Sequence, residues 1–173
     1  MNSEYSERLA LLQQIFDNVN NWLHFAEAKN GALIAFNIAF MTVIMDSNLE
    51  QYSLILYTIL MVGMAISTFA ILLSFKPINK ELPKTDVENI KVNLLHYAYI
   101  ASLEKEEYMK ALYAGYWNET NKNINSIPQI EKDYCAEIIE NARITMRKQK
   151  FFKDGFRIVL LMILVFIVLV ICA

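Results

Sequence analysis

The chain has 173 residues, of which 55% are hydrophobic and 20% are charged, and its formal net charge is −2 at pH 7. The apolar residues are concentrated in blocks, which is the first sign of a membrane protein. Two cysteines and two histidines give neither a disulfide framework nor a zinc-binding pattern, so neither is expected.

Residues 1–30 are predicted to form an N-terminal amphipathic helix on the cytoplasmic side. The apolar residues recur at spacings of three and four, as in a helix that packs against other helices. They are Leu9, Leu12, Phe16, Val19, Leu23 and Ala26. The helix is expected to continue into the membrane.

Two uncharged blocks, residues 31–45 and 53–75, are predicted to form a transmembrane hairpin over residues 31–75. The second block is long enough to cross a bilayer core of roughly 30 Å. The first becomes long enough when it is extended backward past Lys29, whose ammonium can reach the headgroups. The loop between the blocks has acidic but no basic residues, so the positive-inside rule places it outside the cell.

Residues 76–155 are predicted to form a cytoplasmic helical bundle. Thr85 followed by Glu88 is a capping-box signature, which predicts a helix start. The apolar stripe of this helix is predicted to be Val87, Ile90, Leu94, Tyr97 and Ala101. The helix is expected to break near residues 104–107, and a second helix is expected to run through Trp117.

The asparagine-rich residues 118–125 are predicted to form a turn, because asparagine side chains favour local bonds to the backbone over helix. Ser126 with Gln129 is a second capping box, and it predicts a helix that continues, with a possible kink at Gly155, into a third span over residues 156–173. The buried face of this helix is predicted to be Ile127, Ile130, Tyr134, Ile138 and Ala142.

The predicted fold class is therefore all-α: a polytopic membrane protein with three transmembrane helices, a hairpin plus a C-terminal helix, and a cytoplasmic helical bundle. Every basic residue lies before the first span or between residues 76 and 157. Because basic residues are retained in the cytoplasm, the N-terminus and residues 76–155 are expected there, with the C-terminus in the periplasm.

A basic stretch that leads into the third span is the densest candidate binding site. On a helix, positions 143, 147, 150 and 157 share one face, so their cationic groups would converge on one anion or follow a phosphate backbone. The alternative is that they anchor the helix at lipid headgroups. The candidate nucleotide-binding residues are Arg143, Arg147, Lys148, Lys150, Lys153 and Arg157.

Polar residues inside the hairpin spans are candidates for a pore lining. Such groups are costly in lipid and face either another helix or water, so structural hydrogen bonding is the open alternative. They are Asn37, Thr58, Ser67 and Thr68. The chain has no glycine-rich phosphate loop, metal-ligand pattern or nucleophile with its base, so neither an enzyme nor a cofactor is expected.

Residues 20–37 read N-N-W-L-H-F-A-E-A-K-N-G-A-L-I-A-F-N. This segment resembles the N-terminal signature of the Pycsar effector transmembrane family of bacterial antiphage proteins, and the likeness extends over the hairpin. Related effectors of nucleotide-signalling defence, such as the transmembrane effector of Hailong systems, are similar in size and layout. The resemblance implies an effector of the bacterial inner membrane, encoded beside a nucleotidyltransferase or cyclase, that depolarises or permeabilises the membrane when the nucleotide signal changes.

No segment resembles a separate cyclic-nucleotide-binding domain, so the bundle itself would have to read the second messenger, and an oligonucleotide suits a basic helical surface at least as well. The leading hypothesis is an antiphage-defence membrane effector that causes abortive infection through an oligomeric ion channel or pore gated by a nucleotide or oligonucleotide. Besides the lipid bilayer, its partners would be further copies of the chain, with a tetramer favoured. The alternative is a membrane-anchored helical scaffold that recruits a protein partner without conductance.

Overall fold

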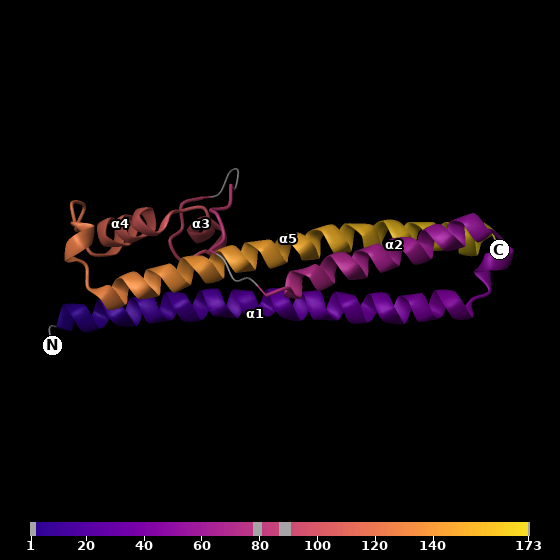
Figure 1. The fold of residues 1–173 in the computed structure, drawn as a ribbon, viewed down its shortest axis with the longest axis horizontal. Helices are drawn as coiled ribbons and strands as arrows, with labels where there is room; N and C mark the ends of the chain where they lie inside the picture. Colours follow the sequence, from indigo (N-terminus) through magenta and orange to yellow (C-terminus); the bar gives the residue numbers. More distant parts are fainter. Residues whose placement is uncertain (1–2, 78–80, 87–90, 173) are drawn as a thin grey trace. The chain divides into compact units, whose positions relative to one another are not determined.

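The computed structural model describes residues 3–77, 81–86 and 91–172, and all the regular elements in these ranges are helical. Three helices are long and apolar enough to cross a membrane. They are α1 (Ser3–Asp46), α2 (Leu54–Leu72), which the 3₁₀ turn η2 (Leu73–Phe75) extends, and α5 (Gln129–Cys172) (Figure 1). The predicted all-α fold with three long apolar helices is confirmed.

The chain divides into two compact units. The bundle unit comprises Met1–Phe25 and Ile78–Arg147, and the span unit comprises Ala26–Pro77 and Lys148–Ala173. The shorter elements are η1 (Leu49–Gln51), α3 (Tyr97–Ala101), α4 (Lys105–Tyr116) and η3 (Ile124–Ser126). By residue number, α1 and α5 contribute to both units, α3 and α4 belong to the bundle unit, and α2 belongs to the span unit.

One seam of α1 is buried along most of the helix, at spacings of three, four and seven. Its apolar members are Leu12, Ile15, Val19, Ala26, Leu33 and Ile44. The predicted packing face of the N-terminal helix is thus largely confirmed. Two buried asparagines, Asn30 and Asn37, lie in the same seam, and Asn37 is fully inaccessible. Buried amides need partners, so these two positions mark where α1 makes polar contacts.

The core of the bundle unit joins α1, α3, α4 and α5. Of the predicted residues, Ile138 and Ala142 on α5 are buried, and so is Ile127, which follows η3. Ile130, however, is 45% exposed, and Glu131 and Cys135 take the buried side instead. The predicted buried face was therefore wrong at Ile130. Glu131 can be buried in its place because the hydroxyl of Tyr113, on another helix, donates a hydrogen bond to its carboxylate at 2.5 Å.

The helix that the sequence predicts from Thr85 does not form as expected. Residues 91–96 are not helical, and α3 begins only at Tyr97. Val87, Glu88 and Ile90 lie outside the described residues. The Asn93 side chain accepts the Leu95 N–H at 2.9 Å. Such local bonds compete with helix formation, which explains the late start of α3.

The boundaries around α4 follow the prediction closely. α4 ends at Tyr116, and Asn118 has a φ of 56°, a left-handed conformation that asparagine tolerates. The predicted cap of the next helix, Ser126, instead donates its hydroxyl to the carbonyl of Asn123 at 2.7 Å. α5 therefore begins slightly later than expected, at Gln129.

In the span unit, α2 runs beside α5 (Figure 1), and two glycines lie where the helices meet. A Cβ on Gly155 of α5 would lie 2.6 Å from Cγ1 of Ile71 on α2, and a Cβ on Gly63 of α2 would overlap Met162 of α5. Small residues let transmembrane helices approach closely, which explains both glycines. α5 continues through Gly155 without a break.

Candidate functional site

The basic residues predicted to bind a nucleotide have different environments, and Arg143 is almost completely buried. Only 4% of it is exposed. Its guanidinium donates to the carbonyls of Leu82, at 2.7 Å, and Leu103, at 2.9 Å, and to the carboxylate of Glu104 at 3.2 Å. The terminal nitrogens of Arg143 are therefore engaged within the bundle unit, where they hold two connecting segments against α5.

Replacing Arg143 with methionine is expected to destabilise the bundle unit by roughly 2–3 kcal/mol, since two carbonyls lose charged donors. The free energy of unfolding in detergent micelles measures this loss. The matched control is Lys150→Met on the same helix, where the side chain is exposed and a change below about 0.5 kcal/mol is expected. Equal effects of the two substitutions would show that Arg143 has no structural role.

Lys148 is also buried, at 8% exposure. Its ammonium donates to the carbonyl of Ser74 at 3.1 Å, pairs with Glu27 at 3.2 Å and lies 5.1 Å from the ring centre of Phe75. In the span unit, this one cation thus connects α5 to α1 and to the end of the hairpin.

The other basic residues are more accessible. Arg147 is half-buried, while Lys150, Lys153 and Arg157 are exposed. Arg157 lies 3.7 Å from Asp154, one turn earlier. Nucleotide binding by the stretch remains a prediction, and its accessible cations are those nearest the third span.

Three of the four candidate pore residues lie together, inside the span unit. The Asn37 amide nitrogen donates to the hydroxyls of Ser67 at 3.0 Å and Thr68 at 3.1 Å, and Ser67 donates to the carbonyl of Gly155 at 3.0 Å. Thr58 is exposed and bonds to its own helix. One polar cluster therefore joins α1, α2 and α5, and within the described residues Asn37 Oδ1 has no hydrogen-bond partner.

Residues 20–37, the segment that carries the family resemblance, supply polar contacts from α1 to α5. In the span unit, Lys29 donates to the side-chain oxygen of Gln149 at 2.6 Å, and the buried Asn30 amide donates to the carbonyl of Lys148 at 3.2 Å. Gln149 was not among the residues predicted from the sequence to have a functional role. Its signal was weak, because a glutamine among basic residues on a helix resembles an ordinary solvated position.

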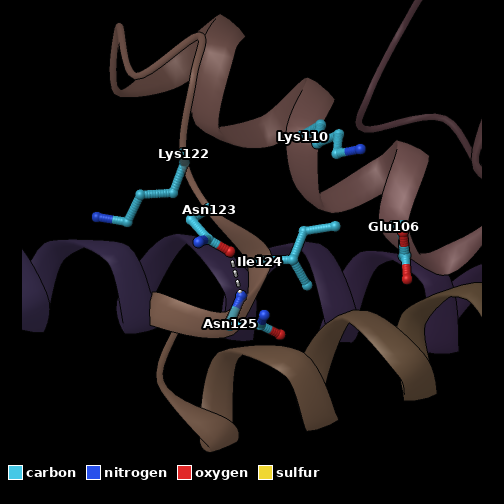
Figure 2. Close-up of a pocket in the computed structure, with 6 residues that line it drawn as sticks. All are labelled: Glu106, Lys110, Lys122, Asn123, Ile124 and Asn125. Carbon is cyan, nitrogen blue, oxygen red and sulfur yellow. Dashed lines mark hydrogen bonds between the residues drawn. The ribbon is translucent and has the colours of Figure 1, made fainter.

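The bundle unit has a hollow of about 400 Å³ between α4 and the segment that precedes α5. Figure 2 shows Glu106 and Lys110 on α4 and Lys122, Asn123, Ile124 and Asn125 on the segment that precedes α5. The lining residues are Glu106, Lys110, Lys122, Asn123, Ile124 and Asn125. The hollow therefore combines two ammonium groups, two amides, one carboxylate and one apolar side chain, a mixture suited to a polar anionic ligand.

A charged network lies next to this hollow. Lys122 donates to Glu119 at 2.7 Å, and the guanidinium of Arg8 binds the other oxygen of the same carboxylate. The hydrogen bond from Lys122 is the main cause that lowers the pKa of Glu119; burial opposes it, and the charge of Arg8 adds to the lowering. Lys122 also lies 5.2 Å from the ring centre of Tyr113. The network fixes the segment that lines the hollow to α1 and α4.

Residues 11–173 match the family model described as Pycsar effector protein domain. No curated protein and no solved structure matches the chain.

Proposed function

Because the chain belongs to the family of Pycsar effector proteins, which are non-enzymatic antiphage membrane effectors that respond to cyclic nucleotides, we propose that it forms a nucleotide-controlled channel. Several copies, with a tetramer favoured, would surround or contain the conduction path. Opening this path in the inner membrane of an infected cell would dissipate ion gradients and cause abortive infection.

The observation that supports this proposal best is the polar cluster of Asn37, Ser67 and Thr68. An apolar span that served only as an anchor would gain nothing from a buried amide with an unpaired oxygen, because unsatisfied polar groups are costly inside a membrane. In a channel the same oxygen meets water or an ion when the path opens. Asn37 and Ser67 are inaccessible within one copy, so we propose that this arrangement is the closed state.

Helix continuity supplies the proposed link between sensing and conduction. α1 and α5 are each a single helix of 44 residues that contributes to both units. A ligand that binds the bundle unit differently in two states shifts the equilibrium between them, and the helices would carry that shift to the spans. In the proposed orientation the N-terminus and residues 76–155 are cytoplasmic, where a second messenger is made, and the C-terminus is periplasmic.

The test is ion flux from liposomes that contain the purified full chain. We expect the flux to change when 3′,5′-cyclic ribonucleotides are added, and the sign of the change shows whether the ligand opens or closes the channel. Empty liposomes are the control. A flux that is the same with and without nucleotides would overturn the proposal and favour the scaffold hypothesis.

A further inference from the structure

The hollow between α4 and residues 122–125 contains a lysine, Lys110, that forms no ion pair among the described residues. Among the described residues Lys110 makes no hydrogen bond or ion pair, and its side chain is exposed. Lys122, by contrast, is bound to Glu119, which Arg8 also binds. Lys110 is therefore the lysine of the hollow that remains available to a ligand.

The charge around the hollow suits a ligand with a single negative charge. Arg8, Lys110 and Lys122 are cationic, and Glu106 and Glu119 are anionic, which leaves one positive charge. Arg8 and Lys122 share the single carboxylate of Glu119, so the excess lies on their side of the hollow, while Lys110, one turn from Glu106 on α4, makes no ion pair among the described residues. A cyclic phosphodiester has one negative charge, whereas an oligonucleotide has one for each linkage and needs a row of cations.

We infer that this hollow is the binding site for a 3′,5′-cyclic mononucleotide, with its phosphate on Lys110. The inference rests on the proposed function, because it gives the nucleotide signal a place in the bundle unit. The volume of about 400 Å³ falls within the range of roughly 300–1,000 Å³ that is common for small-molecule sites.

The other lining residues offer the groups that a nucleoside needs. The side chains of Asn123 and Asn125 can each donate and accept hydrogen bonds at the edge of a base, although Asn123 Oδ1 already accepts the Asn125 N–H at 2.9 Å (Figure 2). Ile124 presents an apolar surface to the base. The carboxylate of Glu106 repels the phosphate, so the phosphate lies toward Lys110. The same carboxylate accepts a hydrogen bond from a hydroxyl of the sugar.

Contacts beside the hollow connect a bound ligand to α1. A ligand that contacts Lys122 or the residues after it acts on the segment that Glu119 connects to Arg8. Arg8 lies on α1 and faces the rings of Tyr113 and Trp117, at 5.2 and 5.3 Å from their centres. Ligand binding would therefore change the packing of α1 in the bundle unit.

The experiment measures binding of the four 3′,5′-cyclic ribonucleotides, by equilibrium dialysis, to the detergent-purified full chain. We expect at least one to bind, and the substitution Lys110→Glu to weaken it roughly 10- to 100-fold, as expected for the loss of one charged hydrogen bond plus repulsion. Lys110→Gln should have a smaller effect of the same sign. Thermal unfolding confirms that the variants remain folded, since Lys110 is exposed.

The matched control reverses charge in the basic stretch of α5, with Lys150→Glu and Lys153→Glu, both exposed. Retained binding in this control, together with the loss in Lys110→Glu, supports the hollow. Unchanged binding in Lys110→Glu overturns the hollow as the site but leaves the nucleotide-controlled channel standing. If the unaltered chain binds none of the four nucleotides, both the site and the control of the channel by these cyclic nucleotides are wrong.

Discussion

Replacing Gly155 with valine is expected to lower the free energy of unfolding of the span unit by about 3 kcal/mol. A Cβ at this position would lie 2.6 Å from Cγ1 and 2.8 Å from Cδ1 of Ile71, which is fully buried. Isoleucine is branched at Cβ and has few alternative rotamers, so it cannot move aside. Overpacking of this kind costs about 1–3 kcal/mol, and α5 would also move away from the hydroxyl of Ser67 that bonds to Gly155.

The other glycines provide a graded control, with alanine at each site. Gly63→Ala should cost less than Gly155→Ala, even though its added Cβ would be closer to a neighbour, because that neighbour is the flexible side chain of Met162. A Cβ on Gly31 meets nothing within 4 Å, so Gly31→Ala should stabilise α1 by roughly 0.5–1 kcal/mol.

The free energy of unfolding in mixed detergent micelles measures all of these effects. Replacing Ile71 with alanine should partly rescue Gly155→Val, because it removes the atoms that the new side chain would meet. The double-mutant cycle should then give a coupling of about 1 kcal/mol or more. Additive effects would mean that Gly155 does not depend on the contact between α2 and α5.

The spans could be predicted from sequence because transfer into lipid depends on composition over about 20 residues, without knowledge of any partner. The turn at residues 118–125 was also predictable, since its signal is local. The late start of α3 was not predictable. The Leu95 N–H donates a hydrogen bond to the Asn93 side chain, this bond competes with helix formation, and the sequence does not show which of the two is more stable. The buried Glu131 was missed for another reason: its partner, Tyr113, lies on a different helix.

In the candidate sites, too, features that depend on nearby residues were predictable, whereas contacts between residues far apart in the chain were not. Helical spacing placed Arg143 and Arg147 on one face, but it could not show that Arg143 would meet the carbonyls of Leu82 and Leu103. The polar cluster was partly predictable, because any polar residue in an apolar span needs a partner. Asn37, Ser67 and Thr68 were singled out on that ground. The hollow beside Lys110 gives no signal in the sequence, because its polar lining residues look like ordinary exposed positions of a helix and the turn after it.

Replacing Asn37 with leucine is expected to reduce nucleotide-controlled flux at least tenfold while it leaves nucleotide binding unchanged. Leucine has a similar branched shape but no polar atoms, so it removes both bonds to Ser67 and Thr68 and also the unpaired oxygen. Hydrogen bonds between transmembrane helices contribute only about 0.6 kcal/mol each, and leucine is more favourable in lipid than asparagine. The free energy of unfolding should therefore change little.

Reduced flux at unchanged stability would distinguish a role of Asn37 in ion conduction from a role in helix packing. If the amide of Asn37 only joins α1 to α2, then a leucine that keeps the three helices together preserves the flux, and the proposed conduction path is wrong. Thr58→Val is the matched control, since Thr58 also lies in an apolar span but is exposed and bonds to its own helix through the carbonyl of Leu54. Loss of flux in Asn37→Leu but not in Thr58→Val, at equal stability, would place the polar cluster on the path of the ions, because a defect in assembly or folding would also lower the stability.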